Sequence, residues 1–502
     1  MQSFKRTVVQ PPTLEAFREA LPDYEVMIVT ILDCILDRYE RDEDYHFIDT
    51  KLNIITGEDF PVLDDAAVDF KSKAAVFGWI QGRGLESLVG HARWLERCTV
   101  LSQEEKENRL IRLGRMIGEV FRRMEVIRAK NGGRVSFMMT PDGDPFDLDE
   151  TGRRRMISLE DRPFGFADLF YAKGMLAAAA FLGLERKTDE AKEYFRRVLA
   201  EVRDERFESD AVSFNPRNPS RSVEGQFAHG PRMIAIGGCA LFAELTGEDE
   251  WFEAGAAIID ELMRTHLNLG QFDGLEVGDY FEHRDADGNP FVEDDHIISD
   301  PGHALEFVGL SAKLLLLLKD RSETRGTAAP PGARGAPSES EGPPAVRQRS
   351  THSRGSRRVG MPHHEALLQN CTDVFPQVFL RNFANGFNAE IGGIRKAVDL
   401  VSRLPVSEEM PWWNLPETMR SAALVLKVCP ESDRLGEVTK AMVDCSNGFM
   451  TRFVNPDVHL MAYQTVGPDG KPVDAIPATP DADPGYHTSL SLIDMLDSLL
   501  KA

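Results

Sequence analysis

The chain has 502 residues, 42% of them hydrophobic, and its 58 basic residues against 81 acidic ones give a net charge of -23. This acidic balance argues against nucleic acid and anionic membrane surfaces as partners, because both repel negative charge. The length would suit two to four domains or one large closed architecture.

Cysteine usage and the apolar runs indicate the compartment. The six cysteines form no CxxC pair and no zinc-like cluster, and they fall mostly within apolar helical stretches. We therefore expect reduced, buried thiols and a cytoplasmic protein. Residues 1–13 lack the apolar core of a signal peptide, and the longest apolar run, about residues 310–318, is too short to span a bilayer.

Helical periodicity of the apolar residues recurs along the chain and predicts twelve helices. They are expected at about residues 15–39, 74–98, 103–129, 165–182, 188–203, 228–245, 249–267, 301–319, 363–381, 412–428, 435–453 and 485–500. Three tight turns, each preceding an even-numbered helix, are predicted at Asp142-Gly143, Asp287-Gly288 and Asp469-Gly470. This order favours an all-α ring of six helical hairpins with short β-hairpins at one end, in which the even helices lie inside.

One stretch does not fit this pattern. Residues 321–360 are rich in Pro, Gly, Ser, Arg and Ala and have no apolar periodicity, so they cannot bury enough surface to become ordered. We predict a disordered insertion within a single domain that spans residues 14–502. Its arginines could bind nucleic acid or protein, but a neutral insertion, or a segment retained only in the predicted coding sequence, is the favoured interpretation.

Four even-numbered helices carry polar or aromatic residues near their starts. Inner helices of an alternating ring all run in the same direction, so these starts would converge at one mouth. The residues are Trp79, Gln81 and Arg83 in the second helix, His303 and Glu306 in the eighth, Trp412, Trp413 and Glu417 in the tenth, and Tyr486 and His487 in the twelfth.

The eighth helix gives the strongest chemical signal. The turn Asp300-Pro301-Gly302 starts a strongly apolar helix, and His303 and Glu306 share one face of its first turn. An ionisable pair at the mouth of a buried helix can be held rigidly and still be reached by a ligand, as acid/base chemistry requires. The structural alternative is a histidine satisfied by the neighbouring glutamate.

The other helix starts suggest a site for sugars. Tryptophan offers a flat apolar face for the C–H face of a sugar ring, while donors and carboxylates bind its hydroxyl groups. The structural alternatives are ordinary core for Trp412 and Trp413, a surface ion pair for Arg83 and a capped helix start for His487. Glu417 lies in an apolar helix, where an acid usually has a partner.

These four groups of residues resemble the signatures of the N-acylglucosamine 2-epimerase family, which includes cellobiose 2-epimerases and mannose and sulfoquinovose isomerases. The resemblance rests on Gln81-Gly82-Arg83, on Asp300-Pro301-Gly302-His303 with Glu306, on Trp412-Trp413 with Glu417, and on Tyr486-His487. It spans about residues 15–500 apart from the insertion.

The resemblance implies an (α/α)6 barrel and an enzyme that interconverts aldoses with their 2-epimers or with ketoses, without a metal or redox cofactor. It implies that His303 and His487 are the acid/base pair and that Arg83 polarises the carbonyl oxygen. Glu306 and Glu417 would orient or hydrogen-bond the sugar. The remaining expected sugar-binding residues are Trp79, Trp412, Trp413 and Tyr486.

The sixth helix departs from the family. The family usually has a histidine and, three residues later, a glutamate after an Asn-Pro-x-Met stretch, and here these positions hold Ile234 and Gly237. A sugar contact is therefore missing or comes from elsewhere, with His229 and Arg232 as the nearby candidates.

The hypothesis is a 2-epimerase or aldose-ketose isomerase that acts on a free reducing sugar through proton transfer at C2 and an enediolate. One alternative is a glycoside hydrolase that uses Glu306, Glu417 or Asp300. Another is a non-catalytic sugar-binding protein, which would not need both histidines. A metal site made by His303, Glu306 and His487 is not favoured. A sugar is the expected partner, and a homodimer is left open.

Overall fold

The computed structural model of the protein describes residues 3–42, 44–60, 70–149, 153–160, 162–207, 225–327, 361–474 and 482–500. These residues are mostly helical, as predicted. The α-helices are α1 (Leu14–Arg18), α2 (Leu21–Glu40), α3 (Gly78–Leu95), α4 (Gln103–Lys130), α5 (Phe166–Phe181), α6 (Glu185–Arg203), α7 (Gly230–Thr246), α8 (Asp249–Thr265), α9 (Pro301–Thr327), α10 (Met361–Gly386), α11 (Asn414–Val428), α12 (Leu435–Gly448) and α13 (Ser491–Leu500). Two short π-helices are η1 (Phe449–Phe453) and η2 (Tyr486–Leu490).

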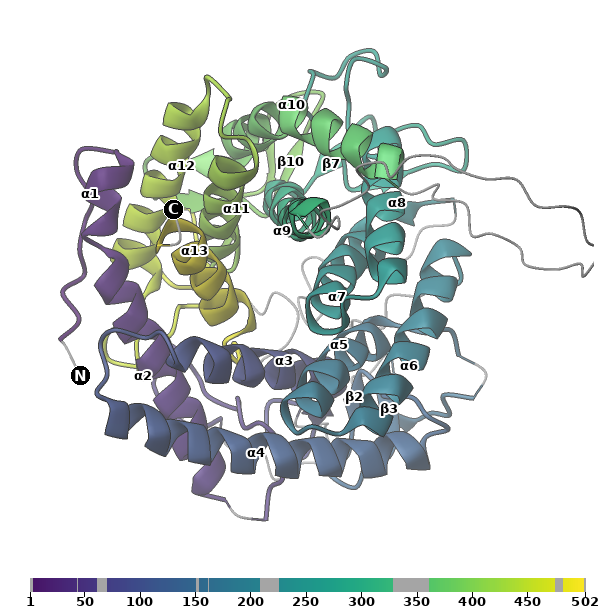
Figure 1. Cartoon of the computed structure of the whole chain (residues 1–502), viewed down its shortest axis with the longest axis vertical. Helices are drawn as coiled ribbons and strands as arrows, with labels where there is room; N and C mark the ends of the chain where they lie inside the picture. Colours follow the sequence, from purple (N-terminus) through teal and green to yellow (C-terminus); the bar gives the residue numbers. More distant parts are fainter. Residues whose placement is uncertain are drawn as a thin grey trace, which may run out of the picture.

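The helices form two concentric layers (Figure 1). Contacts follow the inner ring from α3 to α5, α7, α9 and α11, then to α13 with η2, and η2 contacts α3. The outer helices α2, α4, α6, α8, α10 and α12 lie outside this ring (Figure 1). This arrangement is consistent with the predicted barrel of helical hairpins.

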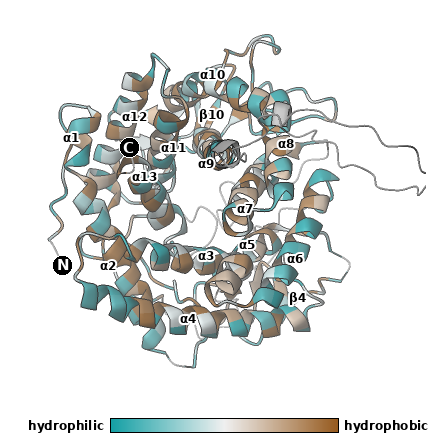
Figure 2. Ribbon diagram, viewed as in Figure 1, coloured by the Kyte–Doolittle hydropathy of each residue, from teal (hydrophilic) through white to brown (hydrophobic). Residues whose placement is uncertain are grey.

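The two layers differ in how their residues are buried. On the inner helix α5 every residue from Ala167 to Ala179 is buried. On the outer helix α6 the buried residues follow a helical spacing of three or four, and Figure 2 shows the resulting brown and teal faces. A helix that is apolar all round is stable only when other helices surround it, which explains why the even-numbered segments of the prediction lie inside.

Inner helices α3 and α5 approach each other unusually closely because glycines face each other across the contact. A Cβ atom on Gly174 would lie 2.3 Å from the carbonyl oxygen of Gly82, and one on Gly82 would lie 2.6 Å from the backbone of Phe170. No side chain fits at either position without movement of a helix. The glycine beside Arg83 therefore sets the helix spacing at the start of α3.

Short strands occupy the connections between helices. They are β1 (Val76–Phe77), β2 (Met138–Met139), β3 (Pro145–Leu148), β4 (Arg154–Met156), β5 (Phe227–Ala228), β6 (His283–Arg284), β7 (Ile298–Ser299), β8 (Phe387–Asn388), β9 (Gly393–Ile394), β10 (Ala397–Asp399), β11 (Pro405–Ser407), β12 (Met410–Pro411) and β13 (Thr465–Val466). They form small antiparallel sheets with the orders β1-β2-β3-β4, β11-β10-β7, β12-β13, β5-β6 and β8-β9.

The three predicted Asp-Gly turns are present. Gly143, Gly288 and Gly470 have φ angles of +84°, +85° and +74°, which favour glycine. In each turn the backbone closes on itself, as in the hydrogen bond from the N–H of Gly143 to the carbonyl of Thr140. The strands β8 to β12 were not predicted, because each has only two or three residues and too little alternation to be detected.

Some boundaries differ from the prediction. The first predicted helix is two helices, α1 and α2, and Pro22 lies in the first turn of α2. The last predicted helix begins as η2 before continuing as α13. Helix α9 extends to Thr327, so residues 321–327, assigned to the insertion, are helical. The rest of the predicted insertion, residues 328–360, lies outside the described residues.

Helix α9 is long and apolar enough, by length and composition, to cross a membrane, but 78% of its most apolar window is buried inside the protein. Its contacts with α7, α10 and α11 identify it as a core helix of the ring. All six cysteines, which lie within the described residues, are buried and unpaired.

Candidate functional site

The predicted residues at the starts of the inner helices lie together. The ring of His303 lies 5.2 Å from that of Trp413, which lies 5.6 Å from the ring of His487. His487 lies 5.0 Å from Tyr486, whose ring lies 5.1 Å from the guanidinium of Arg83. A continuous line of contacts therefore joins the starts of α9, α11, η2 and α3, as the predicted common mouth requires.

The first turn of α9 is fixed by its own sequence. The Asp300 carboxylate accepts hydrogen bonds from the backbone N–H groups of Gly302 and His303, at 3.0 and 3.3 Å, and so caps the helix. Gly302 packs against the side chain of Asn414 on α11, whose Oδ1 would lie 2.0 Å from a Cβ atom. The cap and this close approach together determine the position of His303.

The imidazole of His303 is held by two carboxylates. Its Nδ1 lies 3.0 Å from Oε1 of Glu282 and 3.5 Å from Oδ2 of Asp300. Burial alone lowers the pKa of His303, but the charges of Asp300 and Glu282 outweigh it and raise the pKa to about 9. Lys396, which also pairs with Asp300, opposes this rise. At neutral pH His303 is therefore the protonated, acidic imidazole.

The backbone around His487 is held by Asp483. The carboxylate of Asp483 accepts the backbone N–H groups of Tyr486, His487 and Thr488, at 2.8 to 3.3 Å. Gly485 precedes them with a φ angle of +83°, which favours glycine. The π-helical turn η2 that follows presents Tyr486 and His487 one after the other. Such turns often occur at functional sites.

The imidazole of His487 has the opposite electrostatic environment. Its Nδ1 lies 3.0 Å from Oε1 of Glu417, which is fully buried and also pairs with Arg420. Burial and the nearby charge of Arg83 lower the pKa of His487 well below its usual range, so this histidine is neutral. Burial also raises the pKa of Glu417 to about 7, against the opposing effect of Arg420.

Glu306 lies beside Glu417 and His487. One potential ligand atom of each of these three side chains lies within 4.8 Å of the others. Burial, and then the charge of Glu417, raise the pKa of Glu306. Both glutamates that the sequence singled out therefore lie against His487.

Arg83 has an unusual environment for a cation. Its guanidinium lies 4.0 Å from the ring of Phe170, 4.5 Å from that of Trp79 and 5.1 Å from that of Tyr486. Its Nε is buried without a hydrogen-bond partner among the described residues. Burial lowers the pKa of Arg83. The structural alternative, a surface ion pair, is therefore not its environment, and its Nε remains available for an oxygen of a ligand.

The hydroxyl of Tyr486 is also oriented by a cation. Buried Lys173 on α5 donates a hydrogen bond of 2.6 Å to this hydroxyl and pairs with Glu86 on α3 at 3.0 Å. An ammonium group only donates hydrogen bonds, so the Tyr486 oxygen accepts and its own proton points elsewhere. Burial raises the pKa of Tyr486 and keeps the phenol protonated.

The tryptophans have different environments. Trp413 contacts both histidines, and Lys396 lies 5.5 Å from its ring. Trp412 donates from Nε1 to Thr488 at 3.3 Å and meets His487 edge-on. Trp79 packs against Phe137 and Phe170, which makes it part of the aromatic lining of Arg83.

Sequence reasoning missed several charged residues that contact the site. Two of them lie in connections: Glu282 in the loop before β6 and Lys396 before β10. The other two lie on inner helices: Arg420 on α11 and Lys173 on α5. A detectable signal existed for Arg420, which is three residues after Glu417 on the same helix face. Glu282 and Lys396 lie in irregular connections, whose position relative to the helix starts cannot be read from periodicity.

The positions in α7 where a departure was expected hold no polar side chain, and the two candidate substitutes differ. Ile234 is buried, and a Cβ atom on Gly237 would meet Leu310 of α9 at 2.9 Å, so neither position offers a polar contact. His229 reaches the site, because its Nε2 lies 3.0 Å from Glu282. Arg232 does not contribute there, because it pairs with Glu205 and Glu261.

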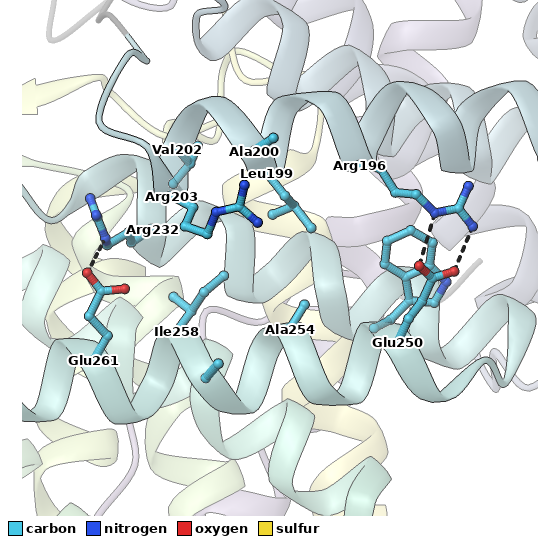
Figure 3. A pocket seen from close by; sticks show the side chains of 12 residues that line it. Arg196, Leu199, Ala200, Val202, Arg203, Arg232, Glu250, Ala254, Ile258 and Glu261 are labelled. Carbon is cyan, nitrogen blue, oxygen red and sulfur yellow. Dashed lines mark hydrogen bonds and ion pairs between the residues drawn. The ribbon is translucent and has the colours of Figure 1, made fainter. Parts of the chain in front are cut away.

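Arg232 instead lines a cavity of about 360 Å³ between the outer helices α6 and α8. Figure 3 shows apolar side chains along it and ion pairs at its two ends, Arg232 with Glu261 and Arg196 with Glu250. This cavity is separate from the line of residues that joins His303 to Arg83.

Comparisons with known proteins agree with this picture. Residues 161–330 match the sequence model of the N-acylglucosamine 2-epimerase (GlcNAc 2-epimerase) family, and this stretch contains His229, Glu282, His303 and Glu306. The matched stretch is about a third of the chain. The resemblance inferred from the motifs is thus confirmed, and it supports an enzyme of the isomerase type. The curated protein sequences contain no match.

Solved structures of this family's relatives share the fold. Cellobiose 2-epimerase from Spirochaeta thermophila has a TM-score of 0.57 at 14% identity, covering 98% of each chain. Cellobiose 2-epimerase from Bacillus thermoamylovorans has a TM-score of 0.55 at 12% identity, covering 92% of this chain and 99% of its own. A D-mannose isomerase has a TM-score of 0.53 at 11% identity, covering 93% and 97%. The likeness therefore extends along nearly the whole epimerase fold.

Proposed function

We propose that the protein is a carbohydrate 2-epimerase or aldose-ketose isomerase that acts on a free reducing sugar within a closed (α/α)6 barrel. The observation that carries the proposal is the pair of imidazoles beside Trp413. The Nδ1 of His303 and the Nδ1 of His487 each lie 3.0 Å from a glutamate oxygen. Each ring thereby has its Nε2 available for a substrate.

The chemistry needs two such groups. The proton on C2 of an open-chain aldose is a weak acid, so a base must remove it while the C1 oxygen gains charge as an enediolate. Neutral His487 suits the role of base, and protonated His303 suits that of acid. Return of a proton to C2 on the opposite face gives the 2-epimer, and return to C1 gives the ketose.

Arg83 suits the stabilisation of the enediolate oxygen. A guanidinium is always charged and rich in donors, and in Arg83 those donors face no carboxylate in the described ion pairs. The Tyr486 phenol, oriented by Lys173, would donate to a sugar hydroxyl, and Trp413 would carry the C–H face of the ring. Glu306 would bind a hydroxyl near the base.

Glycoside hydrolysis fits this arrangement less well. Retaining enzymes place their two carboxyl groups about 5–5.5 Å apart and inverting enzymes place them farther apart to admit a water. Glu306 and Glu417 lie close to each other, with ligand atoms within 4.8 Å, but Glu417 is held by Arg420 and His487 and is therefore poorly placed to act as a free nucleophile or base. A hydrolase would also give the two histidines no role.

The test is incubation of the purified protein with a panel of free aldoses and ketoses in deuterated water. We expect at least one aldose to form its 2-epimer with deuterium at C2, or its ketose with deuterium at C1. Release of reducing sugar from a glycoside, without C2 exchange in any free sugar, would instead support the hydrolase.

A further inference from the structure

Glu282 is bound to the chain segments that carry two histidines. Its backbone carbonyl accepts the N–H of His229 at 3.2 Å, and its backbone N–H donates to Ile298 at 2.8 Å. The pairing of β5 with β6 aligns Ala228 with His283 and so brings His229 beside Glu282. Ile298 belongs to β7, which leads directly to Asp300 and His303. The backbone of Glu282 therefore connects the start of α7 to the start of α9.

The side chain of Glu282 also joins these segments. Oε2 lies 3.0 Å from Nε2 of His229, and Oε1 lies 3.0 Å from Nδ1 of His303. A carboxylate only accepts hydrogen bonds, so both imidazoles must donate to it. His303 therefore carries its proton on Nδ1, and His229 carries its proton on Nε2.

The surroundings of the His229 ring and of its Nδ1 agree with this proton assignment. The ring is fully buried against Tyr280 and His266, at 4.9 and 5.6 Å, and its Nδ1 has no hydrogen-bond partner among the described residues. A buried N–H without a partner is costlier than a bare lone pair, so the proton belongs on Nε2. A metal between His229 and His303 fits less well, because metal-bound histidines usually donate their other N–H to a partner.

We propose that Glu282, anchored by His229, is the positioning residue that fixes the tautomer and orientation of His303 so that its Nε2 faces the substrate. This inference rests on the proposed function of His303. The titratable groups that face His303 are Glu282 from the loop before β6, His283 from β6, Asp300 directly before α9, Glu306 from α9 and Lys396 from the connection before β10, with His229 from the start of α7 behind Glu282. Among these groups, Glu282 alone contacts both His229 and His303.

The first test uses Glu282→Gln, which keeps the shape but replaces one acceptor oxygen by a donor. We expect turnover to fall by about 10- to 100-fold, as for other residues that orient a reacting group, with little change in KM. The alkaline limb of the kcat/KM profile should move to lower pH, because His303 loses a charge that favours its protonated form. Exposed Glu293→Gln, in the loop between β6 and β7, is the matched control and should behave as wild type.

The second test uses His229. His229→Gln can still donate an amide N–H to Glu282 and should keep most of the turnover, whereas His229→Leu cannot donate and should lose several-fold more. Nitrogen-15 NMR of the histidines, assigned with His303→Asn, gives a readout that needs no substrate. We expect the Nδ1–H tautomer of His303 in the neutral form of the wild type and a mixture of tautomers in Glu282→Gln.

The outcomes separate this inference from the proposed function. Normal turnover, an unmoved pH profile and unchanged His303 shifts in Glu282→Gln would overturn the positioning role, even if His303→Asn is inactive. Absence of C2 exchange with any sugar in the wild type would overturn the proposed function, while the NMR comparison would still decide the tautomer of His303. If Glu282→Gln does not fold, the comparison of the two His229 variants decides in the same way.

Discussion

Two histidines with opposite electrostatic environments contact one indole ring. Asp300 and Glu282 favour the charged form of His303, whereas burial and Arg83 favour the neutral form of His487. Groups whose environments push their pKa values apart can act as acid and base at the same pH. The proposed assignment of His487 as base and His303 as acid rests on these surroundings, since the two side chains are chemically identical.

The pH dependence of kcat/KM tests this assignment. The rate should rise with pH as the Glu417–His487 pair loses its proton, with Glu417 near a pKa of about 7. It should fall again as the pH passes through about 9, because the raised pKa of His303 means that its proton is present below that pH and lost above it. A profile that stays flat from neutral pH to beyond the pKa of His303 would contradict the acid role.

Arg83 should be required for turnover but not for stability. Replacement by Met removes a cation that has no carboxylate partner among the described residues, so Arg83→Met should lower kcat by on the order of 100- to 1,000-fold and leave Tm unchanged or higher. The control is Arg93→Met on the same helix, where a partly exposed ion pair with Glu244 is lost and turnover should persist. Parallel kinetics and thermal unfolding measure both effects, and a large drop in Tm for Arg83→Met would assign Arg83 a structural role.

At the scale of the elements, small residues and caps place the helix starts. Asp300 caps α9, Asp483 holds η2, and Gly302 lets α9 approach α11. The Asp-Pro-Gly sequence before His303 is thus required both for the start of the helix and for the packing beneath it. The chemical side chains can be precise because these backbone features are rigid.

The contact between α3 and α5 tests whether small residues are required for the close packing of the inner helices. Gly174→Ala would place a Cβ atom 2.3 Å from the Gly82 carbonyl oxygen, and it should reduce the free energy of unfolding by about 1–3 kcal/mol or more. Gly114→Ala on α4, where nothing lies within 4 Å of the new atom, should be neutral or stabilise by roughly 0.5–1 kcal/mol. Urea unfolding compares the two, and equal stabilities would show that the helices can separate without loss.

Periodicity predicted the helices well because each inner helix is a long apolar run and each outer helix has one apolar face. The site could be predicted only where its residues lie at helix starts, as His303, Glu417 and His487 do. Glu282 and Lys396 could not be predicted, because their positions depend on small sheets whose strands are two or three residues long. The raised pKa of His303 depends partly on the charge of the missed Glu282.

At the scale of the molecule, the candidate site and the predicted insertion come from different parts of the chain. The proposed reacting residues come from inner helices and the connections at their starts, whereas the predicted insertion follows the last residue of α9 in the sequence.

Replacement of residues 328–360, which lie outside the described residues, by a short Gly/Ser linker tests the insertion. The composition of this stretch lacks the apolar periodicity needed to bury surface, so we expect nearly unchanged Tm and turnover. Thermal unfolding and steady-state kinetics provide the measurement. A large loss of turnover with the fold intact would show that the segment acts at the site.

The most direct test of the central claim follows solvent deuterium into C2 of the sugar with wild type, His303→Asn and His487→Asn. We expect both variants to keep the fold and much of the sugar affinity and to lose turnover by on the order of 100-fold or more, the scale of a positioned acid or base. One variant could still exchange C2 slowly, if its remaining histidine removes that proton. Near-normal epimerisation or isomerisation in both variants would contradict proton transfer by this pair.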